Sequence, residues 1–245
     1  MKIDIVIPVY NSQKCLSELV HQLNKALNEF SYHIYFINDC SKDNSWSELK
    51  ELTKGVNNIT SVNLAKNFGQ DCAIMAGLNQ SRGDYIVIMD DDLQHNPMDI
   101  PSLIEQIEKT NADVCYGNYQ KTQQSLFKNF GSWLNDKLAN IVIKKPKYIY
   151  MSPYKIISKS LKDKVIKYDG PYPYVDGLIF RFTSKITGID IMHYPRYAGE
   201  STYTIGKSIS LWLRVLTNFS VIPLRVSTYV GIVSSLIGFL LGLYF

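Results

Sequence analysis

The stretch Tyr85-Ile-Val-Ile-Met-Asp-Asp-Asp-Leu-Gln94 decides the fold of this chain. An apolar run leads directly into three consecutive carboxylates and, two residues later, an amide. Short apolar runs are typical of strands buried in a parallel sheet, and neighbouring carboxylates repel one another unless a cation compensates them. We therefore expect a buried strand over residues 85–89 that ends in an acidic, ligand-binding turn.

Strand and helix periodicities alternate around this stretch through the first 120 residues. Strands that are joined by crossover helices pair in parallel, so the alternation predicts a doubly wound α/β sheet. Ligands bind such sheets at the carboxyl ends of the strands, here residues 9–12, 38–41 and 90–94. The expected strands cover residues 3–7, 32–37, 60–64, 85–89 and 113–116, and the expected helices cover 16–30, 45–53, 71–79 and 101–110.

The acidic turn predicts a metal site. Asp90 and Asp92 face the same side if the extended geometry continues, and Gln94 adds a third oxygen there. Carboxylate and amide oxygens suit Mg²⁺ or Mn²⁺ that bridges a diphosphate. The alternative is a solvated acidic turn. The chain has no G-x-G-x-x-G after the first strand and no G-x-x-x-x-G-K-[ST], which disfavours a dinucleotide enzyme and a P-loop ATPase.

The net charge of +4 hides two halves of opposite sign. Residues 1–120 carry 9 Lys/Arg against 16 Asp/Glu, a net charge of −7, whereas residues 121–245 carry 17 against 6, a net charge of +11. An acidic first half is unusual for a chain that only binds nucleic acid. The lysine cluster at residues 144–147 fits anionic lipid headgroups better than nucleic acid. The four cysteines lack metal or redox spacing and predict reduced, structural thiols.

The last twenty residues, 226–245, carry no charge. A helix of this length spans roughly 30 Å, the thickness of the hydrocarbon core of a bilayer, so we expect a transmembrane helix rather than a buried soluble one. Lys207, Arg214 and Arg225 precede it among apolar residues, which predicts an amphipathic segment on the cytoplasmic face of the membrane. The expected organisation is a catalytic domain over residues 1–205, a juxtamembrane segment over 206–225 and a span over 226–245. Because the chain stops within the apolar segment, it is compatible with a truncation of a longer membrane protein.

Five motifs in one order resemble glycosyltransferase family 2, which has the GT-A (Rossmann-like) fold. Four are Ile5-Val-Ile-Pro-Val-Tyr-Asn11, Asn38-Asp-Cys-Ser41, Asn67-Phe-Gly69 with Ala76-Gly-Leu78, and Asp90-x-Asp92-Leu-Gln94. The fifth, Arg196-Tyr-Ala-Gly-Glu-Ser-Thr-Tyr203, resembles an element of the polyprenyl-phosphate branch, which includes dolichol-phosphate mannose synthase and bactoprenol-phosphate glucosyltransferase. The resemblance covers nearly the whole chain.

The resemblance implies a role for each matching residue. A nucleotide-sugar site is implied at the first three strand ends, a metal site in the acidic turn and an acceptor-phosphate site in the basic half. Asp92, Asp176 and Arg196 are the expected catalytic residues, of which Asp176 is inferred from this chain and does not belong to a matching motif. Asp39 could instead cap a helix, Asp176 could be a plain turn residue, and Tyr203 could be packing. The nucleotide-sugar set is Pro8, Tyr10, Asn11, Asp39, Asn67, Asp90 and Asp91; the metal set is Asp90, Asp92 and Gln94; and the acceptor-phosphate set is Lys121, Lys128, Lys155, Arg196, Ser201 and Tyr203.

Two departures from the branch concern the acceptor. Ser152-Pro-Tyr-Lys155 stands where Gly-Asp-Phe-Arg is usual, and Asn118-Tyr-Gln-Lys121 stands where arginines are usual. A missing base matters less for a phosphate acceptor, which is largely ionised at neutral pH, than for a hydroxyl. The alternative is that Asp176 takes over as a base or positions the acceptor.

The resemblance therefore implies an inverting, metal-dependent enzyme. It would move a sugar from a nucleotide diphosphate sugar to an undecaprenyl- or dolichyl-type phosphate at the cytoplasmic membrane face, without nucleic acid. Two alternatives stay open: transfer to a sugar hydroxyl during glycan assembly, and a membrane-anchored nucleotide-sugar binder without turnover. A homo-oligomer is also open.

Overall fold

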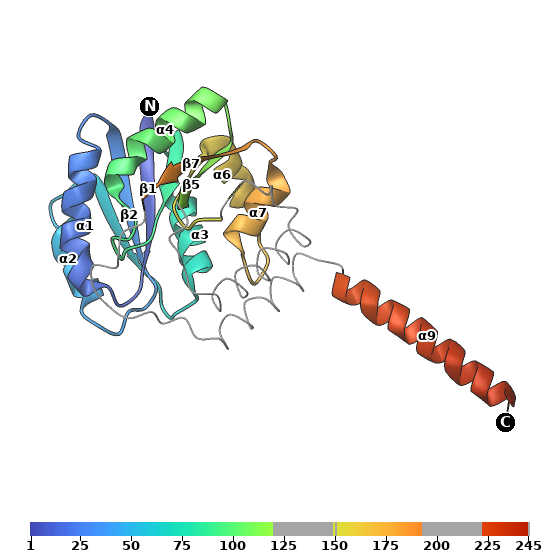
Figure 1. Cartoon of the computed structure of the whole chain (residues 1–245). Helices are drawn as coiled ribbons and strands as arrows, with labels where there is room; N and C mark the ends of the chain where they lie inside the picture. The colour runs from blue at the N-terminus through green and yellow to red at the C-terminus, as the bar shows by residue number, and fades with distance from the viewer. Residues whose placement is uncertain (120–148, 150, 193–221, 245) are drawn as a thin grey trace.

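The computed structural model describes residues 1–119, 149, 151–192 and 222–244 (Figure 1). Its described strands form one seven-stranded sheet in the order β3-β2-β1-β4-β6-β5-β7. The elements are β1 Lys2–Val9, α1 Gln13–Ala26, β2 Ser31–Asn38, α2 Ser45–Thr53, β3 Ile59–Asn63, α3 Gln70–Gln80, β4 Tyr85–Ile88, the 3₁₀ turn η1 Pro97–Asp99, α4 Ile100–Thr110, β5 Val114–Tyr119, β6 Lys155–Ser158, α6 Lys159–Val165, α7 Val175–Phe182, β7 Ile186–Ile191 and α9 Ile222–Tyr244.

The expected α/β sheet is confirmed, and the elements β6, α6, α7 and β7 add to those that the periodicity of the first 120 residues predicted. Strands β1 to β4 are mutually parallel, and β5 is parallel to β7. Strand β6 lies between β4 and β5 and is antiparallel to both. The sheet is therefore mixed rather than uniformly parallel, and the expected strands and helices fall within a few residues of the observed ones.

Helices cover both faces of the sheet, as Figure 1 shows. Successive side chains of a strand point to opposite faces, so Ile5 and Ile7 of β1 pack with α1 and α4, whereas Val6 packs with α3. All three are fully buried, and burying such a side chain contributes about 1.5–3 kcal/mol. Helix α3 lies so close to β1 that a Cβ on Gly77 would overlap Val6.

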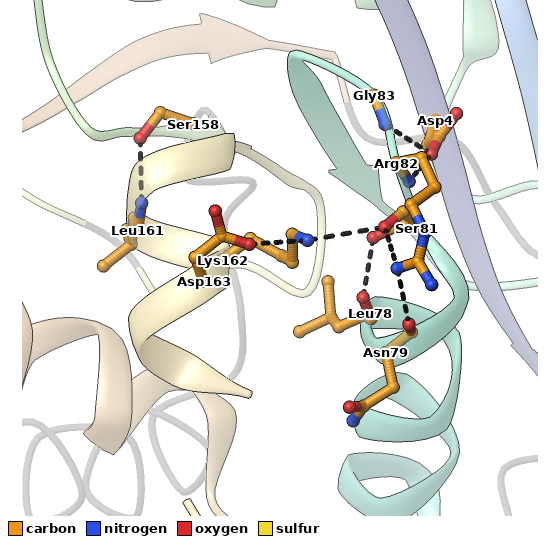
Figure 2. A network of polar contacts seen from close by, with 10 residues as sticks. All are labelled: Asp4, Leu78, Asn79, Ser81, Arg82, Gly83, Ser158, Leu161, Lys162 and Asp163. Carbon is orange, nitrogen blue, oxygen red and sulfur yellow. Dashed lines mark hydrogen bonds and ion pairs between the residues drawn. The ribbon is translucent and has the colours of Figure 1, made fainter. Parts of the chain in front are cut away.

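Polar contacts fasten the amino-terminal edge of the sheet, opposite the acidic turn (Figure 2). The buried carboxylate of Asp4 accepts from the backbone N–H groups of Arg82 and Gly83, which form the turn between α3 and β4. From α6, Lys162 donates to the carbonyl of Ser81 at 3.4 Å. These contacts hold β1, the turn between α3 and β4, and α6 together at this edge of the sheet.

Helix α9 begins at Ile222, before the expected start of the span at residue 226. Among the described residues, one helix is long and apolar enough to cross a membrane, over Ser227–Tyr244. Its described side chains are exposed. Most of the predicted juxtamembrane segment lies outside the described residues.

Candidate active site

The strand register brings the predicted site segments to one edge of the sheet. Val9 of β1 is level with Asn38 of β2, and the N–H of Met89 donates to the carbonyl of Val6 at 3.3 Å. On the other side of β4, Ile88 is level with Lys155, the first residue of β6. The loops after β1 and β2, the acidic turn and the start of β6 are therefore neighbours.

Asp91 ties the acidic turn to the loop after β1. One of its carboxylate oxygens accepts from the backbone N–H of Tyr10 at 3.2 Å. Burial raises the pKa of Asp91 to about 6, although hydrogen bonds from the Ser12 side chain and the Tyr10 N–H oppose the shift. The predicted nucleotide-sugar residue Asp91 thus points into the protein, where it positions Tyr10, which is partly exposed.

Asn11 joins the loops after β1 and β2. It adopts a φ of 57°, its N–H donates to the Ser41 hydroxyl at 3.0 Å, and its side-chain oxygen accepts from the Lys42 N–H at 2.7 Å. Asparagine tolerates this left-handed conformation better than most residues. Pro8 is buried within β1, level with Ile37, so it shapes the strand end beneath the loop.

Asp39 and Asn67 lie where β2 meets the segment before α3. Asp39 is 3% exposed, and its two carboxylate oxygens accept from the N–H groups of Phe68 at 2.7 Å and Gly69 at 2.8 Å. The side chain of Asn67 donates to the carbonyl of Asp39 at 3.2 Å. These contacts resemble the helix-capping alternative, since the two N–H groups lie immediately before the first turn of α3.

The acidic turn does not continue the strand. β4 ends at Ile88, and Leu93 has a φ of 60°, so the extended geometry that would place Asp90 and Asp92 on the same side does not continue through the turn. Asp90 accepts from the Gln70 side chain at 2.6 Å, and Asp92 accepts from the N–H of Gln94 at 3.1 Å. The turn is thus held by hydrogen bonds to both carboxylates.

The oxygen ligands in this turn fit a hard divalent cation. Asp90, Asp92 and Gln94 are all half-buried and offer two carboxylates and one amide. Hard cations such as Mg²⁺ take a few protein oxygens together with substrate phosphates. In the described part of the chain, no three His, Cys, Asp or Glu side chains are grouped as metal ligands. A cation at this turn would need further oxygens, from water or from ligand phosphates, to complete its coordination.

His95 was not predicted to belong to the site. It is 3% exposed, its Nδ1 accepts from the N–H of Asp90 at 3.3 Å, and its ring stacks on Tyr154 with centroids 5.1 Å apart. The hydroxyl of Tyr154 donates to the carbonyl of Asn96 at 3.0 Å. His95 therefore supports the backbone of the acidic turn. Its only signal in the sequence is its position directly after Gln94.

Lys155 and Asp176, predicted separately, form one ion pair. Lys155 is only 2% exposed, and the same oxygen of Asp176 accepts from the Tyr116 hydroxyl at 2.8 Å. The ammonium group of Lys155 also lies over the Tyr116 ring, 5.2 Å from its centroid. Burial, followed by the charge of Asp176, raises the pKa of Tyr116 well above its ordinary value, so the phenol stays protonated and donates. One oxygen of Asp176 thus accepts from both Lys155 and Tyr116.

Asp71, in the first turn of α3, also lies in this region and was not predicted as a site residue. Its carboxylate accepts from the N–H of Val175, the first residue of α7, at 2.9 Å. Burial raises the pKa of Asp71 to about 6, the hydrogen bond from Val175 opposes the shift, and the charge of Asp176 adds to it. The two residues are 104 positions apart, so no local pattern could have indicated the contact.

Five predicted residues, all in the acceptor-phosphate set, lie outside the described residues. They are Lys121, Lys128, Arg196, Ser201 and Tyr203.

Comparisons with known proteins agree with this geometry. The family model for Glycosyl transferase family 2 matches residues 4–172. The chain is similar to the undecaprenyl-phosphate 4-deoxy-4-formamido-L-arabinose transferase of Pseudomonas fluorescens (strain SBW25), with 32% identity over 97% of this chain and 70% of that protein. The Yersinia enterocolitica protein of the same name is 33% identical over 98% of this chain and 74% of its own length.

Two solved structures share the fold. S. aureus TarS 1–349 in complex with UDP-GlcNAc has a TM-score of 0.57 at 20% identity and covers 89% of this chain and 67% of its own. Glucosyl-3-phosphoglycerate synthase from Mycobacterium tuberculosis, in complex with Mn²⁺ and UDP-Glc, has a TM-score of 0.61 at 12% identity over 88% and 76%. These likenesses confirm the GT-A fold that the motifs led us to expect.

Proposed function

Since the chain belongs to glycosyltransferase family 2, we propose that it transfers a sugar from a nucleotide diphosphate sugar to a polyprenyl phosphate at the cytoplasmic face of a membrane. One observation carries the choice of acceptor. Relatives at 32% identity over 97% of the chain are named as undecaprenyl-phosphate sugar transferases. The sugar itself is left open, because specificity for one sugar depends on a few pocket side chains.

The donor side of the proposed site is the edge formed by the loops after β1 and β2 and the acidic turn. Asn11 holds the loops after β1 and β2 together, Asp39 holds the second of these loops to the segment before α3, and Tyr10 offers a partly exposed ring. Asp90, Asp92 and Gln94 are the residues that would hold Mg²⁺ or Mn²⁺. Such a cation supplies neutralisation of the charge that builds up on the leaving nucleotide diphosphate.

The acceptor side begins at Lys155, beside the acidic turn. An oxygen of the acceptor phosphate attacks the anomeric carbon from the face opposite the leaving diphosphate, whose bond to the sugar breaks, so the configuration inverts. The phosphate is largely ionised at neutral pH and needs no base to remove a proton. This fits the pairing of Asp176 with Lys155 and Tyr116, which leaves Asp176 better suited to positioning than to proton abstraction. Arg196 remains the proposed hold on phosphate.

Helix α9 supports the proposed location. A lipid phosphate stays at the membrane surface, so an enzyme that uses it gains from an anchor beside its site, and Ser227–Tyr244 is apolar enough to provide one. Positive residues before the span favour a catalytic domain on the cytoplasmic side.

The test is turnover that depends on the acceptor. The detergent-solubilised protein is incubated with Mg²⁺ and a panel of nucleotide sugars, including donors of glucose, N-acetylglucosamine and 4-deoxy-4-formamido-L-arabinose, with and without undecaprenyl phosphate. We expect release of the nucleotide diphosphate only when undecaprenyl phosphate is present. Release of the nucleotide diphosphate with a glycan acceptor but not with the lipid phosphate would show that the acceptor is a sugar hydroxyl. Binding of the donor without any release would show that the protein is a nucleotide-sugar binder without turnover.

Asp92→Ala and EDTA are the matched tests of the metal proposal. Both should abolish turnover, because both remove the neutralisation of the leaving group. Asp163→Ala is the control, since this half-exposed carboxylate of α6 pairs with Lys162 at the opposite edge of the sheet. Full turnover in EDTA would contradict metal dependence.

A further inference from the structure

Residues 67–71 contact three separate parts of the site. The N–H groups of Phe68 and Gly69 donate to Asp39 after β2. The next side chain, Gln70, donates to Asp90 in the acidic turn at 2.6 Å, and the one after it, Asp71, accepts from the first N–H group of α7. One short segment therefore joins the loop after β2, the acidic turn and α7.

The contact of Asp71 with α7 fixes the acceptor side of the site. Val175 is the first residue of α7, and Asp176 follows it in the same turn. A carboxylate at the amino terminus of a helix accepts a hydrogen bond from an N–H group that lacks a partner within the helix. Its negative charge also interacts favourably with the positive end of the helix dipole. Because Asp176 pairs with Lys155, whatever holds the start of α7 also sets the position of this ion pair.

Lys155 in turn lies beside the donor side. It is level with Ile88, the last residue of β4 before the acidic turn, and level with Tyr116 of β5. The acidic turn and the Lys155–Asp176 pair are thus joined twice: along the sheet through β4 and β6, and through α3 by the neighbouring side chains Gln70 and Asp71. Only the connection through α3 depends on individual side chains, Gln70 and Asp71, so a single substitution can break it.

We propose that Asp71 is a positioning residue that holds the start of α7, and with it the Lys155–Asp176 pair, in register with the donor site for the acceptor phosphate. This inference rests on the proposed function, because it assigns the Lys155–Asp176 pair to the acceptor side. It predicts that Asp71 affects use of the acceptor and leaves donor binding unchanged.

The test compares three variants of the full chain. Asp71→Ala removes the acceptor of the Val175 hydrogen bond, Asp71→Asn keeps an oxygen there without the charge, and Asp163→Asn changes a carboxylate remote from the site. For each we would measure the KM for undecaprenyl phosphate, kcat, and the dissociation constant of the donor by calorimetry. We expect a roughly tenfold or larger rise in acceptor KM for Asp71→Ala, as loss of a charged hydrogen bond implies, with recovery of most of it in Asp71→Asn.

A second measurement is independent of turnover. Hydrogen exchange of the backbone amides of α7 should be faster in Asp71→Ala than in the parent, and near the parent rate in Asp71→Asn. An unchanged acceptor KM in Asp71→Ala overturns the inference, as does an equal weakening of donor binding. If the parent protein transfers no sugar to lipid phosphate, the proposed function is wrong. The positioning role is tested separately, and it is overturned if the backbone amides of α7 exchange no faster in Asp71→Ala than in the parent.

Discussion

Replacing Asp39 tests whether the hydrogen bonds that its carboxylate accepts from backbone N–H groups stabilise the fold. Its carboxylate is 3% exposed and accepts two backbone N–H groups, from Phe68 at 2.7 Å and Gly69 at 2.8 Å. Hydrogen bonds to a charged group contribute roughly 1.5–3 kcal/mol each. Asp39→Ala loses both, so the free energy of unfolding should fall by about 3–6 kcal/mol. Asp39→Asn keeps one accepting oxygen, so it should fall by roughly 1.5–3 kcal/mol.

The assay is urea unfolding of the detergent-solubilised protein, followed by tryptophan fluorescence. The urea concentration at the unfolding midpoint should fall, while the slope of the free energy of unfolding against urea concentration stays constant. This combination indicates a change in stability rather than in the compactness of the folded or unfolded state. Asp84→Asn is the control, because this exposed carboxylate also accepts a backbone N–H, from Lys2 at 2.8 Å, and should lose less than about 1 kcal/mol.

A loss below about 1 kcal/mol in Asp39→Ala would refute the structural role. Weaker nucleotide binding with unchanged stability would instead assign Asp39 to direct contact with the nucleotide, as the family resemblance implies. The paired measurement of stability and nucleotide affinity therefore separates the two roles.

Three further changes have expected outcomes. Gly77→Ala should lower stability by about 1–3 kcal/mol, since the added methyl overlaps Val6, and an unchanged melting temperature would rule out the close packing of α3 on β1. Tyr116→Phe should lose about 1 kcal/mol with its hydrogen bond to Asp176, and a more stable variant would show that this bond is not formed. Burial raises the pKa of Asp71 from 3.8 to about 6, so the folded protein binds a proton that the unfolded chain releases between these pH values. Stability from this group therefore falls as the pH rises through that window, and the melting temperature of Asp71→Asn should rise relative to the parent between about pH 4 and pH 7. A difference in melting temperature between Asp71→Asn and the parent that does not change with pH would contradict the raised pKa of Asp71.

The sheet was largely predictable, because its signal is local. Apolar periodicity located β1 to β4 and the helices between them, and the crossover connections then predicted parallel pairing. Strand β6 was not predictable in this way. Only two of its residues, Ile156 and Ile157, are apolar, and its antiparallel placement depends on β4 and β5.

The sequence predicted which side chains of the candidate site lie near one another, but not their contacts. Carboxylates at strand ends were expected at one edge of the sheet and lie there, yet the pattern could not indicate that Asp39 and Asp91 would accept backbone N–H groups of the protein. Likewise, Lys155 and Asp176 were each singled out, but their pairing depends on how α7 packs. The contact of Asp71 with Val175 joins distant parts of the chain and has no local signature.

The most direct test of the central claim is the nature of the bond that the enzyme forms. Labelled sugar is transferred in the presence of undecaprenyl phosphate and Mg²⁺, and the lipid product is treated with mild acid. Transfer to phosphate predicts that the label is released as free sugar, because a glycosyl phosphate bond is labile to acid. Label that remains lipid-linked or glycan-linked after mild acid would show a glycoside to a hydroxyl and would contradict the account.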